Sequence, residues 1–260
     1  MKKLNLSFLK NITDEDKFLL NQVADWVTAA ENKYIKKYSF FLDECQSMFC
    51  EQVLKSLKFN NYKLYGGCER ANRKILSVYS EYCIVNDDDF PIRCLLFKYN
   101  SKYTLSHRDF LGSLMSLNIA RNTVGDIVVS KGCAQIYVYN TIYELVLQSI
   151  SKIGRVGVTV QENNIEPIEA DVKFEEISGT ASSLRLDCIL SLSLHISREK
   201  SKSIIMTKGV IINHIITYSV DTVLNMGDIF SVKGFGKYIL KSINGVSKKN
   251  RFHITLNKYV

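Results

Sequence analysis

The sequence predicts an α+β protein in three parts: an N-terminal helical domain, a middle domain of alternating strands and helices, and a small C-terminal α/β unit. Three observations lead to this fold class. Apolar residues recur at helical spacing near the start, strand and helix patterns alternate after them, and an excess of positive charge is confined to the end of the chain. We place the domains at residues 1–71, 72–180 and 181–260.

The first domain is predicted to be helical. Thr13-Asp14-Glu15-Asp16 has the pattern of a capping box, because a carboxylate follows the N-cap hydroxyl three residues later. A second helix is expected over residues 42–57, and the glycine turn at residues 65–68 ends the domain. The apolar residues at helical spacing in the first helix are Phe18, Leu19, Leu20, Val23, Trp26, Val27 and Ala30.

The middle domain is predicted to alternate strands and helices. A capping box at Ser106-His107-Arg108-Asp109 begins one helix, and Thr141 begins another that runs to residue 153. The order β-β-α-β-β-α-β is typical of a split β-α-β, ferredoxin-like sandwich. The strands are expected at residues 75–85, 92–99, 126–130, 134–139 and 155–161.

A connector over residues 162–183, with one expected strand at 172–177, leads to the C-terminal unit. Two short helices are expected there, at residues 183–193 and 198–208. Strand patterns then predict a small sheet from residues 209–213, 228–233, 237–244 and 251–256.

The charge of the chain lies almost entirely in this C-terminal unit. From Ser182 onward there are twelve Lys and Arg but four Asp and Glu, a difference of +8 that equals the net charge of the chain. The rest holds 22 residues of each sign and is neutral. A compact basic end on a neutral body predicts a polyanionic partner for the C-terminal unit.

Other protein classes are not favoured. No apolar stretch approaches the ~18 residues of a membrane span, and the N-terminus lacks the apolar core of a signal peptide. Seven scattered cysteines with no C-x-x-C pair indicate free thiols in a reducing compartment rather than disulfides or a zinc site. We therefore expect a cytoplasmic protein without a membrane anchor or a bound metal.

Five short motifs follow one another in the C-terminal unit: Arg185-Leu186-Asp187, Ser197-Arg198, and the segments 208–213, 227–233 and 234–237. This series resembles the RNA-binding module named after small-subunit ribosomal protein S-four. Arg198, Lys202 and Lys208 recur at near-helical spacing, so they can face a phosphate backbone together. The candidate RNA-binding residues are Arg185, Arg198, Lys202, Lys208, Asn213, Lys233, Lys237, Lys248, Lys249 and Arg251.

Motifs over nearly the whole chain resemble those of the bacterial YlmH family. They are Tyr65-Gly66-Gly67-Cys68-Glu69-Arg70-Ala71, residues 107–114, Arg121 with Val124-Gly125-Asp126-Ile127, Ile153-Gly154-Arg155 and Ser247-Lys248-Lys249-Asn250-Arg251. The resemblance implies a helical domain, a middle domain like an RNA-recognition motif, and the S-four-like module. It also implies binding to the large ribosomal subunit in rescue of stalled translation, and a link to cell-division gene clusters. Ser201, Lys237 and Asn250 depart from the family pattern, which usually has Ala, Arg and Gly there.

Three enzyme-like motifs are given structural interpretations. His107-Arg108-Asp109 lacks the other kinase motifs and is read as a helix start. Arg185-Leu186-Asp187 resembles an active-site triplet of pseudouridine synthases, but Asp187 is expected to serve the first turn of a helix. No glycine pattern predicts a nucleotide cofactor.

Alternation in the segment Gln135-Ile136-Tyr137-Val138-Tyr139 places both tyrosines on one face of the middle sheet. Exposed aromatic residues on a sheet can stack on bases, as they do in RNA-recognition motifs. Half-buried tyrosines are equally ordinary in sheets. Base stacking at Tyr137 and Tyr139 is therefore the less favoured of two interpretations.

The sequence thus predicts a non-enzymatic protein that binds structured ribosomal RNA, with tRNA as a further partner, on the large ribosomal subunit. No cofactor, no catalytic residue and no small-molecule substrate are expected. Two alternatives from other classes are an RNA-modifying enzyme resembling pseudouridine synthases and a scaffold for cell-division proteins.

Overall fold

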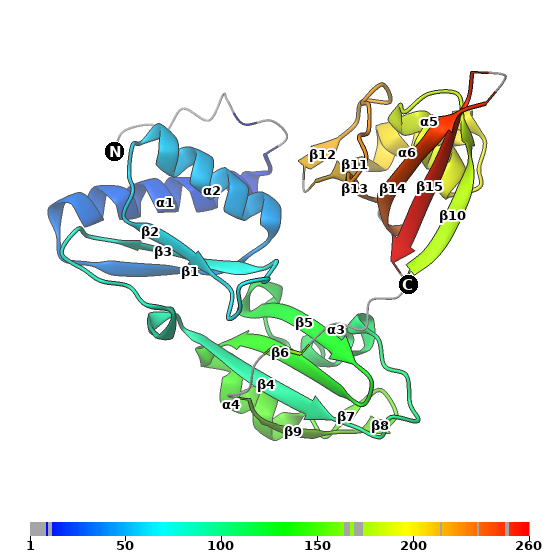
Figure 1. The fold of residues 1–260 in the computed structure, drawn as a ribbon. Helices are drawn as coiled ribbons and strands as arrows, with labels where there is room; N and C mark the ends of the chain where they lie inside the picture. Colours follow the sequence, from blue (N-terminus) through cyan, green and yellow to red (C-terminus); the bar gives the residue numbers. More distant parts are fainter. Residues whose placement is uncertain are drawn as a thin grey trace. The chain divides into compact units, whose positions relative to one another are not determined.

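The computed structural model describes residue 9 and residues 12–163, 167–168, 174–213, 215–232, 234–247 and 250–259 (Figure 1). The chain is a mixed α/β protein of two compact units, Met1–Asp171 and Val172–Val260. In the described part of the chain, no helix is long and apolar enough to cross a membrane.

The N-terminal part of the first unit contains the two predicted helices. α1 (Asp14–Asn32) begins at the expected capping box: Asp16 N donates to Thr13 Oγ1 at 3.1 Å, and Thr13 N donates to Asp16 Oδ2 at 2.9 Å. α2 (Glu44–Ser56) is the second helix. The buried residues of both helices form one core with Leu76 and its neighbours in the adjoining sheet.

Three strands accompany these helices and correct the prediction of an all-helical domain. β1 (Lys36–Leu42), β2 (Tyr62–Tyr65) and β3 (Lys74–Tyr79) form an antiparallel sheet in the order β1-β3-β2. The sequence does not predict β1, because a bulge between Tyr38 and Phe41 interrupts the alternation of inward- and outward-facing residues along the strand. Because β3 pairs with β1 and β2, this sheet extends beyond residue 71, where the first domain was expected to end.

The middle part of the first unit is a four-stranded antiparallel sheet in the order β5-β6-β4-β9. Because β3 lies in the N-terminal sheet, the strand expected first is absent here, and the order along the chain is β-α-β-β-α-β, a split β-α-β arrangement. The elements are η1 (Asp87–Asp89), β4 (Ile92–Lys98), α3 (His107–Met115), η2 (Arg121–Thr123), β5 (Val124–Ser130), β6 (Cys133–Tyr139), α4 (Asn140–Ser149), β7 (Lys152–Ile153), β8 (Val156–Gly157) and β9 (Thr159–Glu162).

The two faces of this sheet pack on different partners. Residues from α3 and α4 form a core with one face (Figure 1). On the other face, Tyr137 is buried in a core with Phe41 and Ile75 of the N-terminal sheet. Arg73 joins the two sheets further, since its Nε donates to Val124 O at 3.0 Å and its Nη2 donates to Phe41 O at 3.1 Å.

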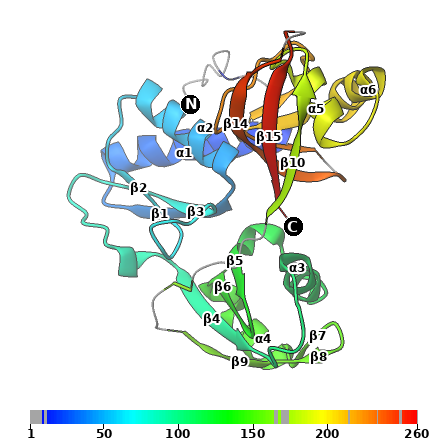
Figure 2. The ribbon, with the colours of Figure 1, turned by 45° about the vertical axis from the view of Figure 1, so that its right-hand side comes forward.

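The C-terminal unit packs α5 (Leu186–Ser193) and α6 (Arg198–Lys208), which lie side by side, on a six-stranded sheet (Figure 2). The strands are arranged in the order β10-β15-β14-β13-β11-β12. β10 pairs along its whole length with β15, so the sheet begins before the boundary expected at residue 181. Their bounds are β10 (Phe174–Ala181), β11 (Val210–Ile212), β12 (Ile215–Thr217), β13 (Ile229–Val232), β14 (Gly236–Val246) and β15 (Phe252–Tyr259).

Candidate nucleic-acid interface

A buried carboxylate lies between two arginines where α5 and α6 begin. The side chain of Asp187 is 0% exposed. Its Oδ1 accepts from Arg185 Nε at 3.2 Å, and its Oδ2 accepts from Arg198 Nε at 2.8 Å. Arg185 also pairs with Asp221. These contacts hold the starts of the two helices together.

The electrostatics of this cluster keep Asp187 ionised. Burial acts to raise the pKa of its carboxyl, but hydrogen bonds and charges from Arg198 and Arg185 outweigh burial and hold the pKa below the usual value of 3.8. The side chains of Arg185 and Arg198 remain 36% and 48% exposed. Their outer N–H groups can therefore still donate to a phosphate from a fixed position.

Three further lysines, Lys200, Lys202 and Lys208, lie on α6. Ser197 caps the helix by accepting from Lys200 N at 3.2 Å, and Ile204 and Ile205 are buried in the core. Lys200 and Lys208 are exposed and Lys202 is half-buried. Among the described residues, none of the three lysines has an ion-pair partner, so their charges are available to a polyanion.

Lys208 has a neighbour that sequence patterns did not indicate. Its Nζ lies 5.3 Å from the centroid of the Phe235 ring, which is 36% exposed. An ammonium over an aromatic face is a cation–π contact. A lysine and an accessible aromatic ring thus occur together at the end of α6, a pairing suited to a phosphate and a base.

Three other predicted residues are placed differently. Asn213 adopts φ 44° in the β11–β12 turn, where its Nδ2 donates to Asp228 Oδ1 at 2.7 Å and its Oδ1 accepts from Ile229 N at 2.9 Å. Arg251 donates through Nη2 to Thr180 O at 2.9 Å. The Nζ atom of Lys237 lies 5.4 Å from the centroid of the Tyr259 ring. The side chains of Asn213 and Arg251 thus already hold the fold together, although Arg251 is exposed.

Lys233, Lys248 and Lys249, also predicted to bind RNA, lie outside the described residues. All three departures from the family pattern lie within the described residues, and Lys237 is the one already placed over Tyr259. Ser201 is fully buried, and its hydroxyl lies 2.7 Å from Asp187 O and 2.8 Å from Arg198 O, so the extra oxygen is satisfied. Asn250 has φ 52°, a left-handed conformation that explains why Gly suits this position.

The glutamates of β10 reduce the charge that the sequence count assigned to the C-terminal unit. Glu176 Oε2 lies 2.7 Å from Lys241 Nζ, and Glu175 Oε2 lies 2.9 Å from Lys258 Nζ. Both acids precede Ser182, so a count that starts at that residue omits them. Two of the twelve counted cations are therefore neutralised by their own sheet.

The sheet face of the middle domain is not open to bases. Tyr137 is 3% exposed beneath the N-terminal sheet, and the ring centroid of Tyr139 lies 5.0 Å from that of Phe40. Next to them, Ile168 N donates to Gln135 Oε1 at 2.7 Å, and Gln135 is buried. The less favoured interpretation, that Tyr137 stacks on a base, is excluded, because the other sheet of the same unit covers the ring.

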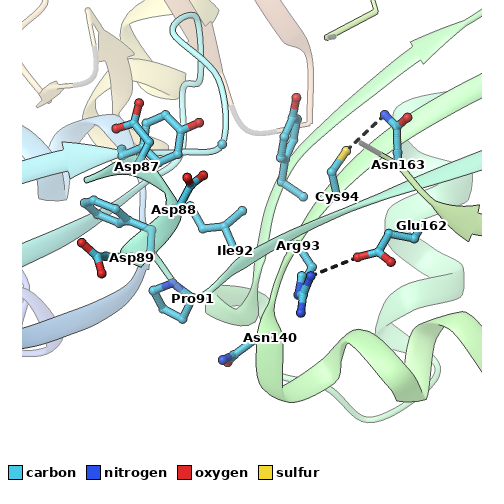
Figure 3. A pocket seen from close by; sticks show the side chains of 14 residues that line it. Asp87, Asp88, Asp89, Pro91, Ile92, Arg93, Cys94, Asn140, Glu162 and Asn163 are labelled. Carbon is cyan, nitrogen blue, oxygen red and sulfur yellow. Dashed lines mark hydrogen bonds and ion pairs between the residues drawn. The ribbon is translucent and has the colours of Figure 1, made fainter. Parts of the chain in front are cut away.

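A hollow of about 580 Å³ beside the start of β4 gathers carboxylates (Figure 3). Asp87, Asp89 and Glu162 form ion pairs with Lys63 at 2.7 Å, Lys36 at 3.6 Å and Arg93 at 3.0 Å, respectively. These pairs leave the acidic lining largely compensated by its own neighbours.

The same hollow contains Cys94, whose side chain lies beside Asn163 (Figure 3). Burial raises the pKa of the Cys94 thiol to about 11, so the thiol is protonated at neutral pH and a poor nucleophile. Within the described ranges, no group of three or more His, Cys, Asp or Glu residues could hold a metal ion.

Comparison with known proteins matches the middle domain to a family. Residues 86–167 match a family model described as "Putative RNA-binding domain in YlmH". The predicted resemblance to the YlmH family is confirmed. The matched residues contain the whole β5-β6-β4-β9 sheet with α3 and α4.

Two further comparisons extend the similarity beyond the middle domain. The chain is 26% identical over 246 residues to "Ribosome-associated protein quality control protein P2" of Bacillus subtilis (strain 168), a match that covers 94% of this chain and 95% of the relative. A solved structure, "Cell division protein ylmH from Streptococcus pneumoniae", is 24% identical with a TM-score of 0.50 and covers 60% of this chain and 94% of the other. The latter similarity concerns the fold alone.

Proposed function

We propose that this protein binds structured ribosomal RNA on the large ribosomal subunit, contacts tRNA there, and acts without catalysis in the rescue of stalled translation in the cytoplasm. The observation that carries the proposal is the basic surface of α5 and α6. There, Asp187 orients two arginines, and α6 carries three lysines that have no acidic partner among the described residues. Such a surface suits a phosphate backbone.

The similarity to the Bacillus subtilis quality-control protein supports the ribosomal setting, because it spans nearly the full length of both chains. We further propose that the middle domain corresponds to an RNA-recognition-motif-like domain and that the C-terminal unit corresponds to the S-four-like module. Its helix pair followed by short strands supports that correspondence.

The absence of catalysis is proposed from Asp187. A catalytic aspartate has to reach its substrate, whereas both oxygens of this carboxylate are engaged by arginines and its side chain is fully buried. The RNA-modifying alternative therefore has less support than the binding function.

A division-linked role is the second candidate function. The observation that favours it is the fold shared with the Streptococcus pneumoniae protein named for cell division. Such a role predicts a protein partner whose binding survives treatment with ribonuclease. The RNA-binding proposal predicts the opposite.

Sedimentation of cell extracts through a sucrose gradient, followed by crosslinking and sequencing of the bound RNA, tests the proposal. We expect the protein to sediment with large subunits, to leave that fraction after ribonuclease treatment, and to crosslink to ribosomal RNA and tRNA. Sedimentation apart from ribosomes, or an association that ribonuclease does not affect, would contradict the ribosomal function and favour the division-linked role.

A further inference from the structure

The domain matched to YlmH has no net charge, but its positive and negative side chains lie at different ends of its sheet. Residues 86–167 contain eight Lys and Arg and eight Asp and Glu. The sheet separates these charges. Acidic residues of the hollow in Figure 3, including Asp87 and Glu162, lie where β4 begins and β9 ends, whereas basic residues gather at the opposite end of the same strands.

We call this opposite end the basic sheet end and define it by Lys98, Lys102, Lys131, Lys152 and Arg155. The antiparallel register brings its parts together. Lys98 closes β4 opposite Cys133 of β6 and Thr159 of β9. The loop after β4 contacts the β5–β6 turn, since Tyr99 N donates to Gly132 O at 2.9 Å.

The β7–β8 hairpin, which carries Lys152 and Arg155, belongs to the same end. Val158 N donates to Ser151 O at 2.9 Å, so the hairpin closes immediately before β9 begins at Thr159. Figure 1 shows the hairpin beside the end of β4. Three loops that are distant in sequence therefore form one surface.

The charge of this surface is positive throughout. All five basic side chains are exposed, and none has an ion-pair partner in the part of the chain that the structure describes. The contributing segments 97–105, 127–134 and 150–160 contain no Asp or Glu. A cluster of five cations with no acid among them attracts a polyanion.

One aromatic residue stands within the cluster. Tyr103 is 55% exposed, and its backbone N donates to Asn100 O at 3.0 Å, which fixes the turn that carries it. A tyrosine presented beside lysines can stack on an unpaired base while the lysines hold the phosphates. The usual alternative in a split β-α-β domain, the open sheet face, is closed here by the packing of Tyr137.

We propose that the basic sheet end is a second RNA-contact surface, in which the five cations hold the phosphate backbone of structured RNA and Tyr103 stacks on an unpaired base. The inference rests on the proposed RNA-binding function and adds a surface to it. RNA is favoured over a membrane or an acidic protein because Tyr103 is the only exposed large apolar side chain in the three segments, all of which the structure describes. Either of those partners would call for a larger apolar area.

The test uses the full chain and protein-free large-subunit ribosomal RNA. One variant combines Lys98→Glu, Lys102→Glu and Lys131→Glu, and a second neutralises the same lysines to Gln. The matched control combines Lys33→Glu, Lys37→Glu and Lys55→Glu, exposed N-terminal lysines whose reversal changes the net charge equally. We expect the Glu variant to bind RNA about fivefold more weakly than the control, with a smaller dependence on salt. Tyr103→Ala should weaken binding about twofold.

A variant of α6, Lys202→Glu with Lys208→Glu, separates this inference from the proposed function. If the α6 variant loses binding while both sheet-end variants bind RNA as the control does, the second surface is refuted and the proposed function stands. If no variant loses binding, the proposed function fails and this inference fails with it. A photo-crosslinking residue at position 103 shows directly what this position contacts when the protein is bound to the ribosome. Crosslinks to RNA support the proposed surface, and crosslinks to protein alone overturn it.

Discussion

The basic surface of α6 and the basic sheet end of the middle domain acquire positive charge by different routes. On α6, the cations stand close together in sequence, and a count of the last eighty residues already finds them. At the sheet end, Lys98, Lys131 and Arg155 come from separate loops of a domain with no net charge, and only the strand register unites them. The charge of a segment is thus a poor guide to the charge of a surface.

The largest expected effect is on stability and concerns Tyr137, which lies on the covered sheet face of the middle domain. Tyr137→Ala should lower the free energy of unfolding by about 3–5 kcal/mol, as for other large aromatic side chains removed from a core. Thermal unfolding checks this loss, and Tyr103→Ala is the exposed control, which should change stability by no more than ~0.5 kcal/mol. A Tyr137→Ala protein of wild-type stability that binds RNA weakly would show that the sheet face is a binding surface after all.

The next effect concerns Asp187, whose carboxylate orients Arg185 and Arg198. Asp187→Asn should reduce the free energy of unfolding by roughly 1.5–3 kcal/mol, because it removes hydrogen bonds between charged groups. Since the folded pKa of Asp187 lies below its usual 3.8, its stabilisation is present above about pH 4 and is lost as the pH falls toward the folded pKa.

Denaturation at several pH values measures this contribution. The wild type should lose stability below about pH 4 more steeply than Asp187→Asn, which has no carboxyl to titrate. Equal slopes would remove the ionic role assigned to the residue. Loss of a pseudouridine from ribosomal RNA in cells carrying the Asn variant would instead support the enzyme alternative.

A smaller effect is expected from the lysines of α6. Lys202→Glu with Lys208→Glu should weaken binding to large-subunit RNA about tenfold, or ~1.4 kcal/mol, by removing phosphate contacts. Arg198 is left unchanged, because reversing its charge would place a second carboxylate against buried Asp187. Lys33→Glu with Lys37→Glu is the matched control, and equal affinity of the two variants would mean that the α6 lysines are merely solvated.

The smallest change is expected from removing the first unit. Residues 172–260 alone should retain most of the RNA affinity, within about tenfold of the full chain, with a log–log salt slope that reflects their phosphate contacts. Residues 1–171 should bind more weakly, and equal affinity of the two fragments would reverse the ranking of the two basic surfaces. The C-terminal fragment has to include β10, because Ile177 and Ala181 belong to its core.

Sequence reasoning succeeded where structure is local. Both capping boxes, at Thr13 and Ser106, begin helices as predicted, since their hydrogen bonds span only three residues. It missed β1, whose bulge breaks the alternation, and it assigned β3 to the wrong sheet, because partner choice depends on distant strands.

The candidate site divides in the same way. The helix predicted over residues 198–208 is present and contains Arg198, Lys202 and Lys208. That Asp187 would hold Arg198, or that Asn213 would be engaged in a turn, depends on contacts across eleven and fifteen residues. Spacing cannot supply such contacts, and the cover over Tyr137 comes from a sheet almost a hundred residues earlier.

The contacts of Arg73 bear on how the first unit loses its structure. One guanidinium donates to carbonyl oxygens of β1 and β5, and Phe41 packs within van der Waals reach of Gly125. The N-terminal sheet and the middle sheet are thus joined through buried hydrogen bonds and side-chain packing. In hydrogen exchange, the amides of β1, β3 and β6 should open in one cooperative event rather than sheet by sheet. The stretch that carries the YlmH match is accordingly part of a larger foldon, and its rigidity depends on residues that lie outside it.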